Sequence, residues 1–342
     1  MTRAIDGFRA DVGFGVIGAE HAHIYTMVDE LLAQGAQLVG FSAESDATRA
    51  VFGRRYSQPL MEPEALLTHP AIRLIVTAAT PSQRAEIGVS AMKCGHDVLA
   101  AKPGVISFQA LEEVRAAEQE SGRRFMIWYS ERLNSPATLR AIELAADGAI
   151  GDVVHVLGLG PHRLDLDQRP PWFADTAKAG GILTDIGSHQ TDHFLHFTRC
   201  VSARVEASAI ANRATTSFPD FSDYGELSLA GGHARGFARV DWLSPIGLGV
   251  WGDSRTLVMG TAGYLEVRRT IDLLGRPGGE HLFVVDQKGP RYIDCRGQPR
   301  PFFADLVADV KDRSSLTGGS VTGLLAAELA IMAQAIAIPL AA

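Results

Sequence analysis

Residues 13–23 read GFGVIGAEHAH, an apolar run that ends in a glycine and a polar turn. The glycines up to Gly18 fit the spacing of the dinucleotide-binding pattern, but that pattern has to follow the first strand and open the first helix. Residues 14–17 are themselves the strand, because they form the apolar run. We therefore expect the turn to begin at Gly18, with Glu20 and His23 in the places of the second and third glycines.

Short apolar segments alternate with helical segments through the first third of the chain. Strands joined by helices of this length predict right-handed crossovers and an α/β fold with a parallel, doubly wound sheet. The expected strands cover residues 14–17, 37–41, 72–79, 97–101 and 125–129, and the expected helices cover residues 24–34, 47–56, 84–95 and 108–121.

The pattern changes after Glu131, where consecutive strands with glycine-rich turns replace the alternation. Such strands predict an α+β domain with a large open, mainly antiparallel sheet. We expect a first domain at residues 1–131 and a second at residues 132–342, whose terminal helices are free to pack back on the first. Strands are expected at residues 153–159, 203–212, 226–230, 234–242, 255–260, 264–268 and 281–286, and helices at residues 136–147, 302–313 and 321–338.

The size and composition of the chain bound its class. At 342 residues it is longer than one core usually fills, which favours two domains. Apolar residues make up 46% and charged residues 21%, as in ordinary globular proteins. The net charge of −7, without a run of Lys or Arg, argues against a nucleic-acid partner, which needs a basic face.

Three features predict a cytoplasmic protein. Residues 1–11 carry charges and no apolar core, so they do not resemble a signal peptide. Residues 324–342 are apolar but contain Glu328 and Gln334 and reach Pro339, which favours a buried helix over a membrane span. Widely separated cysteines predict reduced thiols, with neither a disulfide framework nor a zinc site. They are Cys94, Cys200 and Cys295.

The turn after the first strand departs from the usual nucleotide-binding loop. A carboxylate at Glu20 adds bulk and negative charge beside phosphates, so Glu20 has to swing away, pair with a cation or spoil the site. His21 and His23 either face the phosphates or only pack the loop and helix. The second strand ends without the usual acid, so either Glu44 reaches the ribose or Ser42 leaves room for a 2′-phosphate. These residues do not choose between NAD and NADP.

A second stretch, GGILTDIGSHQTD at residues 180–192, carries acid–base groups. It is expected to be helical through Phe197, which places Asp185 and His189 four residues apart on one face. A histidine titrates near neutral pH, and a neighbouring carboxylate tunes its charge and aims its ring.

Three segments together resemble one known family. Residues 79–81, ATP, are similar to its cofactor-contacting Thr-Pro turn, and residues 95–103, GHDVLAAKP, to its Gly-Lys-His-Val…Glu-Lys-Pro signature. Residues 180–192 are similar to its Gly-Gly…Asp-x-Gly-x-His-x-x-Asp signature. The whole chain thus resembles the Gfo/Idh/MocA (glucose–fructose oxidoreductase / inositol dehydrogenase) family of NAD(P)-dependent oxidoreductases.

The resemblance implies a Rossmann domain that binds NAD or NADP, an α+β domain whose open sheet forms a homo-oligomer, and sugar or polyol substrates. It assigns catalytic roles to Lys102, Asp185 and His189. Departures from the family pattern are Glu20, His23, the missing acid of the second strand, and Ala101 where glutamate usually precedes the lysine. The expected cofactor-binding residues are Gly18, Glu20, His21, Ser42, Glu44, Ala79, Thr80, Pro81, Lys102 and Pro103.

These residues support oxidation of a secondary alcohol. We expect His189 to take the hydroxyl proton, Lys102 to stabilise alkoxide character, and Asp185 to orient His189. Arginine, histidine and tryptophan side chains near the motif suit a hydroxylated or acidic substrate. They are Arg132, His162, Arg163, Trp172 and His193.

Two other functions remain open. Glu20 and the missing ribose acid also fit a non-catalytic or regulatory relative that senses a sugar or nucleotide. Asp185, His189, His193 and His162 could hold zinc in a metal-dependent lyase or hydrolase. A metal-bound His189 cannot act as a base, so we expect no metal.

Overall fold

The computed structural model describes residues 12–341, which divide into two compact units. The first contains the described chain up to Ala101, together with Glu113–Phe125 and Pro301–Gly319. The second contains Lys102–Glu112, Met126–Arg300 and the described chain from Ser320 onward. The expectation for residues 1–11 lies outside the described residues. The sequence placed one boundary after Glu131, whereas the contacts place three separate segments in each unit.

The first unit is built on a parallel sheet with the strand order β2-β1-β3-β4-β5. Strands β1, β4 and β5 are buried along their whole length, as expected for a sheet that carries helices on both faces. The doubly wound sheet is therefore confirmed. Leu60 adds one isolated parallel bridge to Phe41 on the outer side of β2.

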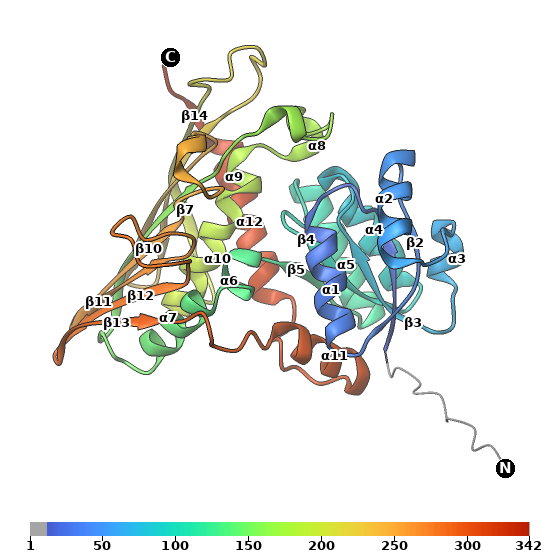
Figure 1. Cartoon of the computed structure of the whole chain (residues 1–342), viewed down its shortest axis with the longest axis horizontal. Helices are drawn as coiled ribbons and strands as arrows, with labels where there is room; N and C mark the ends of the chain where they lie inside the picture. Colours follow the sequence, from blue (N-terminus) through green and yellow to red (C-terminus); the bar gives the residue numbers. More distant parts are fainter. Residues whose placement is uncertain (1–11, 342) are drawn as a thin grey trace. The chain divides into compact units, whose positions relative to one another are not determined.

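Every strand and helix predicted in the first unit is present, and the short helix α3 is an addition. Figure 1 shows the helices around the strands of this unit. The elements are β1 (Gly13–Ile17), α1 (His23–Ala33), β2 (Gln37–Ser42), α2 (Asp46–Tyr56), α3 (Pro63–Leu67), β3 (Ile72–Thr77), α4 (Pro81–Lys93), β4 (Asp97–Ala101), α5 (Phe108–Ser121), β5 (Phe125–Trp128) and α11 (Phe302–Asp312), with α5 and β5 crossing the boundary between the units.

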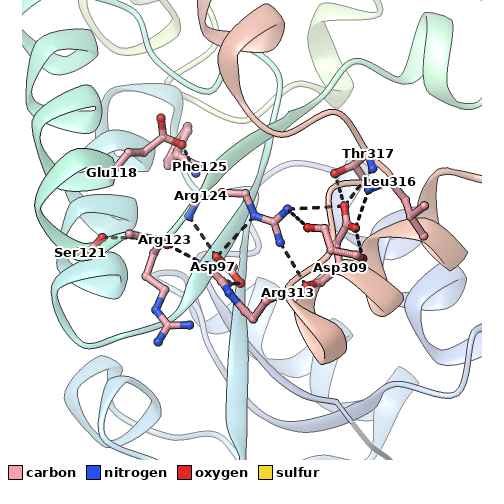
Figure 2. Close-up of polar contacts among 12 residues, drawn as sticks. Asp97, Glu118, Ser121, Arg123, Arg124, Phe125, Asp309, Arg313, Leu316 and Thr317 are labelled. Atoms are coloured by element: carbon pink, nitrogen blue, oxygen red, sulfur yellow. Dashed lines mark hydrogen bonds and ion pairs between the residues drawn. The ribbon is translucent and has the colours of Figure 1, made fainter.

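A buried polar network fixes α11 to the first unit. Arg124 lies between Asp97 of β4 and Asp309 of α11 (Figure 2), with its backbone N 3.0 Å from Asp97 Oδ1 and its Nη1 3.5 Å from Asp309 Oδ2. Arg313 pairs with the other oxygen of Asp97. Residues more than 180 positions apart in sequence therefore share one set of charges, which explains why this terminal helix belongs with the front of the chain.

We expect Asp309→Ala to lower the free energy of unfolding by about 3–5 kcal/mol, because it breaks a buried charge network and orphans several donors. Asp309 is fully buried and accepts hydrogen bonds from the N–H groups of Leu316 (2.7 Å) and Thr317 (2.9 Å) and from the hydroxyls of Ser314 and Thr317. Urea denaturation measures the loss. Asp312→Ala, on the exposed end of α11, is the matched control and is expected to change stability by less than about 0.5 kcal/mol.

The same carboxylate makes stability depend on pH. Burial alone raises the pKa of Asp309, but hydrogen bonds from Ser314, Thr317 and Leu316 lower it below its ordinary value. A carboxyl whose pKa is depressed on folding contributes stability above its unfolded pKa, about 3.9, and loses it as the pH falls through the folded pKa. Below about pH 4 the parent and Asp309→Ala should therefore converge, and an equal gap at every pH would contradict this assignment.

The second unit is built on a nine-stranded sheet with the order β13-β12-β11-β10-β6-β9-β8-β7-β14. The β6–β9 and β7–β14 pairs are parallel and the other pairs are antiparallel. Buried and partly exposed positions alternate along β6 and β8, so one face of the sheet is covered and the other is open. Figure 1 shows helices on one face only. The expected open, mainly antiparallel sheet is confirmed.

The helices α9, α10 and α12 cover the buried face, and hydrogen bonds join them to one another and to the sheet. Thr191 of α10 donates to the carbonyl of Ala326 in α12 at 2.7 Å, and Ser208 of β7 donates to the carbonyl of Ala333 at 2.7 Å. The elements are α6 (Ser130–Leu133), α7 (Pro136–Ala146), β6 (Val153–Pro161), η1 (Leu166–Gln168), α8 (Thr176–Ala179), α9 (Ile182–Asp185), α10 (Gly187–Thr198), β7 (Arg204–Ala211), β8 (Tyr224–Gly231), β9 (Ala234–Asp241), η2 (Ile246–Leu248), β10 (Arg255–Gly260), β11 (Gly263–Arg268), β12 (His281–Asp286), β13 (Gly289–Asp294), α12 (Val321–Ile336) and β14 (Ile338–Pro339).

The end of the chain differs from the prediction. The sequence predicted a helix at residues 321–338, but α12 ends at Ile336 and Ile338 pairs with β7 as part of β14. Pro339 explains the change, because a residue before proline is pushed out of the helical region into an extended conformation. Among residues 12–341 no helix combines the length and the apolar character that crossing a membrane requires.

Candidate functional site

The glycine pair before the motif is required by the backbone. Gly180 and Gly181 have φ angles of +92° and +84°, in the region that side-chain-bearing residues rarely adopt. A Cβ atom on Gly181 would lie 2.5 Å from the side chain of Gln334, which accepts a hydrogen bond from the N–H of Leu183 at 3.0 Å. The glycine pair therefore lets the chain enter α9 in close contact with the Gln334 side chain of α12.

The motif is two helices rather than the single helix that the sequence predicted. Helix α9 ends at Asp185 and α10 begins at Gly187. The N–H of His189 donates to the carbonyl of Ile186 at 3.1 Å, and the Ser188 hydroxyl donates to the carbonyl of Asp185 at 2.8 Å. This local side-chain bond replaces a regular helical bond, as serine often does at helix ends. Asp185 and His189 are therefore not stacked along one regular helix.

Asp185 pairs with Lys102, not with His189 as the sequence analysis expected. The Lys102 Nζ lies 2.6 Å from Asp185 Oδ1, and the two side chains are 6% and 18% exposed. Lys102 directly follows β4 and belongs by its contacts to the second unit. The carboxylate thus holds the ammonium in place in a largely water-free setting, where such a pair has a defined geometry.

His189 is buried and lies edge-on to Tyr129, with the ring centroids 6.1 Å apart. Burial lowers the pKa of His189 well below its ordinary value, the charge of Glu131 opposes that change, and the charge of Lys102 adds to it. The imidazole is therefore neutral near pH 7. Its Nδ1 has no hydrogen-bond partner among residues 12–341, so no protein contact locks its tautomer.

Glu131 is a candidate site residue that the sequence did not reveal, since there it marked only the boundary between the expected domains. It is 1% exposed, accepts a bond from Arg269 Nη2 at 2.9 Å and lies 3.6 Å from His162 Nε2. Burial raises its pKa, but Arg269 and the histidines His189 and His162 bring it well below the ordinary range, so it stays ionised. The signal in the sequence was a carboxylate in the short helix that follows β5, since doubly wound sheets place functional groups after their strand ends.

The five expected substrate residues have different surroundings. Arg132 forms a bidentate pair with Asp192, with donor distances of 2.7 and 3.0 Å, so this guanidinium is used inside the unit and not held free for a substrate. His193 Nδ1 lies 3.4 Å from the Thr256 hydroxyl, and burial lowers the pKa of His193. Arg163 bonds to Asp165 at 2.6 Å.

His162 and Trp172 lie among aromatic rings. The His162 ring is 4.2 Å from that of Trp251 and 5.3 Å from that of Trp242, and burial lowers its pKa to about 4. The half-buried Trp172 contacts the Phe173 ring at 6.2 Å. Of the five, His162 and His193 belong with His189 to a cluster around Glu131, because the charge of each of the three histidines lowers the pKa of the Glu131 carboxyl.

The histidine cluster is not arranged as a metal site. Within the described part of the chain, no group of three His, Cys, Asp or Glu side chains is placed to hold a metal ion. His162, His189 and His193 surround a carboxylate that already binds Arg269. The described side chains of this cluster therefore form an ionic network centred on Glu131.

The nucleotide-binding loop of the first unit has the predicted frame. Strand β1 ends at Ile17, and Gly18 starts the turn with a φ of +82°, where a Cβ atom would lie 2.3 Å from Ala79 Cβ. The Glu20 side chain reaches the end of β2, where its Oε1 accepts the N–H of Glu44 at 2.6 Å. Its role toward a bound phosphate stays a prediction.

A cavity of about 440 Å³ lies beside this loop. Its lining includes five of the expected cofactor residues and the carboxyl ends of β1 and β2. The steric space and the glycine turn fit a dinucleotide bound at the switch point of a doubly wound sheet. Those five lining residues are Gly18, Glu20, Ser42, Glu44 and Ala79.

The remaining expected cofactor residues lie outside that lining. His21 Nδ1 accepts the N–H of His23 at 3.1 Å, and their rings meet edge to face at 4.2 Å. Thr80 and Pro81 start α4, as the N-cap and the first helical residue. Pro103 follows Lys102 in the second unit. Their roles toward a cofactor stay predictions.

Comparison with known proteins assigns the chain to a family. The model described as "Oxidoreductase family, NAD-binding Rossmann fold" matches residues 10–129, and the model for the GFO/IDH/MocA C-terminal domain matches residues 138–266. The chain belongs to the Gfo/Idh/MocA oxidoreductase family. This confirms the resemblance seen in the three motifs and the expected cofactor class, NAD or NADP.

Individual relatives agree with the family. A crystal structure from Erwinia carotovora atroseptica, described as an oxidoreductase, is 37% identical, with a TM-score of 0.93, and the match covers 96% of this chain and all of that one. Scyllo-inositol 2-dehydrogenase (NADP(+)) IolW of Bacillus subtilis is 26% identical over 48% of this chain and 47% of its own length. The 1,5-anhydro-D-fructose reductase of Ensifer adhaerens is 24% identical over 52% and 54%. The chain thus matches about half the length of these two curated relatives.

Proposed function

We propose that the chain is an NAD(P)-dependent oxidoreductase that acts on a secondary alcohol of a sugar, a polyol or a derivative. The observation that carries the proposal is the buried Lys102–Asp185 pair in the same unit as a neutral, buried His189. The two curated relatives are named for an inositol and an anhydrosugar, which supports this substrate class.

The residues divide the chemistry between them. The neutral imidazole of His189 accepts the hydroxyl proton in oxidation and returns it in reduction. The ammonium of Lys102 donates to the substrate oxygen and stabilises its negative charge, while Asp185 holds that ammonium in position. A nicotinamide nucleotide, held by the loop at Gly18 and the cavity beside it, takes up or supplies the hydride when bound.

Incubation of the purified chain with NAD or NADP and a panel of inositols, aldoses and anhydrosugars tests the proposal. Reduced nicotinamide absorbance should rise with at least one member, and the rate should persist after treatment with a chelator. No turnover in either direction, with nucleotide binding intact, would favour the non-catalytic sensor. Activity that the chelator removes and added zinc restores would favour the metal-dependent enzyme.

We expect Glu131→Gln to move the acidic limb of the kcat/KM profile for oxidation to lower pH by about 0.5–1 unit. The reason is that the Glu131 charge raises the pKa of His189, so its removal, which also frees Arg269, lets the imidazole stay neutral in more acidic solution. A pH profile measures the shift. Asp147→Asn, an exposed acid at the end of α7, should leave the profile in place, and a limb that moves to higher pH in Glu131→Gln would refute the coupling.

We also propose that the open face of the nine-stranded sheet joins copies of the chain into a homo-oligomer. Met259 of β10 and Tyr264 of β11 are large apolar side chains that are 50% and 43% exposed on adjacent, paired strands. Their burial between copies would remove apolar surface from water. Light scattering on the purified protein tests this, since a monomer at micromolar concentration would exclude a stable assembly.

A cytoplasmic location is proposed from the cysteines. Cys94, Cys200 and Cys295 are free thiols in the structure, which suits a reducing compartment. Fractionation of cells that express the tagged chain checks the location, and recovery outside the cytoplasm would contradict it.

A further inference from the structure

The cavity beside the nucleotide loop is strongly acidic. Among the described residues that line it, five are glutamates and one, Arg49, is basic. A cavity of about 440 Å³ with this lining offers many hydrogen-bond acceptors, and it disfavours any phosphate beyond the pyrophosphate that every nicotinamide dinucleotide carries. The five acids are Glu20, Glu44, Glu62, Glu64 and Glu86.

Two of these acids are held at the end of β2, where doubly wound sheets bind the adenosine ribose. Glu20 Oε1 accepts the backbone N–H of Glu44 at 2.6 Å, and the Glu44 carboxylate accepts a bond from the Gln83 amide. Glu20 comes from the loop after β1 and Glu44 from just beyond β2, so two elements converge there. A carboxylate from the loop after β1 and one from the residues after β2 therefore meet where the second strand itself carries no acid.

The single base of the lining, Arg49, lies beside the end of β2 and is already engaged by the protein. Arg49 Nε donates to the carbonyl of Ala43 at 2.7 Å, and its Nη1 pairs with Asp46 at 3.1 Å. A bound 2′-phosphate needs an arginine or lysine to offset its charge, as in NADP-binding relatives of this fold type. Ser42 at the end of β2 is small, but the lining that contains it carries five carboxylates against this one guanidinium.

We propose that Glu20 and Glu44 together bind the ribose hydroxyls of NAD(H) and exclude the 2′-phosphate of NADP(H). The inference rests on the proposed function and adds the choice of nucleotide, with Glu20 as a specificity-determining residue at the place of the usual second glycine. It separates this chain from its Bacillus subtilis relative, whose name specifies NADP(+).

Titration of the full-length protein with NADH and with NADPH, followed by nicotinamide fluorescence and by calorimetry, tests the choice. NADH is expected to bind at least about 100-fold more tightly, because NADPH replaces the 2′-hydroxyl donor by a phosphate that the two carboxylates repel. The disadvantage of NADPH should shrink as the salt concentration rises, since its repulsive part is screened.

Variants assign the effect to the two residues. The double variant Glu20→Gln/Glu44→Gln keeps the shape of both side chains. It should reduce the ratio of the NADPH dissociation constant to the NADH dissociation constant by at least about 10-fold, mainly through tighter NADPH binding. Glu120→Gln removes the same charge from an exposed site on α5 outside the cavity and should leave both dissociation constants unchanged. Circular dichroism melting checks that each variant is folded.

The outcomes are distinct. Preferential NADH binding that the double variant erodes supports the inference. NADPH binding as tight as that of NADH overturns it and leaves the proposed oxidoreductase in place. A ratio that the double variant does not change overturns the roles of Glu20 and Glu44, and binding of neither nucleotide removes both the inference and the proposed function.

Discussion

Replacement of Lys102 by methionine is expected to lower kcat by about 10²–10³-fold, the usual effect of losing one donor to a developing oxyanion. Lys102 is 5% exposed and its Nζ lies 2.6 Å from Asp185, so the charge acts in a largely water-free setting where it counts most. Methionine has a similar length and retains the packing. Steady-state kinetics on the best substrate of the panel measures the loss.

The matched control is Lys178→Met in the same unit. Lys178 also pairs with an aspartate, Asp175, at 3.5 Å, but both side chains are more than 40% exposed, and the rate should change by less than about 2-fold. Because Asp185 acts by holding Lys102, Lys102→Met and Asp185→Asn should combine with a smaller loss than the product of their separate effects. Full activity of Lys102→Met, with NADH binding unchanged, would remove the lysine from the mechanism.

His189→Gln should lower kcat for alcohol oxidation by about 10²–10⁴-fold, the range for loss of a general base. Glutamine is comparable in size and polarity but does not take up a proton near neutral pH. The dissociation constant for NADH should stay within about 2-fold, since the proposed role of His189 is proton transfer with the substrate hydroxyl. His233→Gln, an exposed histidine in the turn between β8 and β9, is the control.

The pH profile gives an independent test of His189. Its pKa is lowered, chiefly by burial, so the imidazole stays neutral below pH 6.5, the ordinary histidine value. Oxidation by the parent chain should therefore hold its rate at pH 6 and fall only in more acidic solution, as the base becomes protonated. The residual activity of His189→Gln should lack that limb, and an unchanged limb would assign it to another group.

Much of the fold could be predicted from local pattern. The alternation of apolar strands and helices between Gly13 and Trp128 depends on burial on both faces of a sheet, and hydrophobic periodicity reports that burial directly. Gly18, Lys102 and the Gly180–Gly181 pair were also identifiable, because their roles follow from backbone conformation or from position at a strand end. The exceptions were local as well, such as the shortening of α12 before Pro339.

The pairing of the charged side chains was decided only by the tertiary structure. Lys102 and Asp185 are 83 positions apart, and Glu131 and Arg269 are 138 apart. Periodicity places a residue on a face of its own element but carries no information about which distant element packs there. Local pattern was therefore enough to predict the doubly wound front, the open sheet and the residues able to do acid–base chemistry. Which carboxylate serves the lysine and which the histidine was settled by packing, because a buried charge has to pair with whatever opposite charge the fold brings beside it.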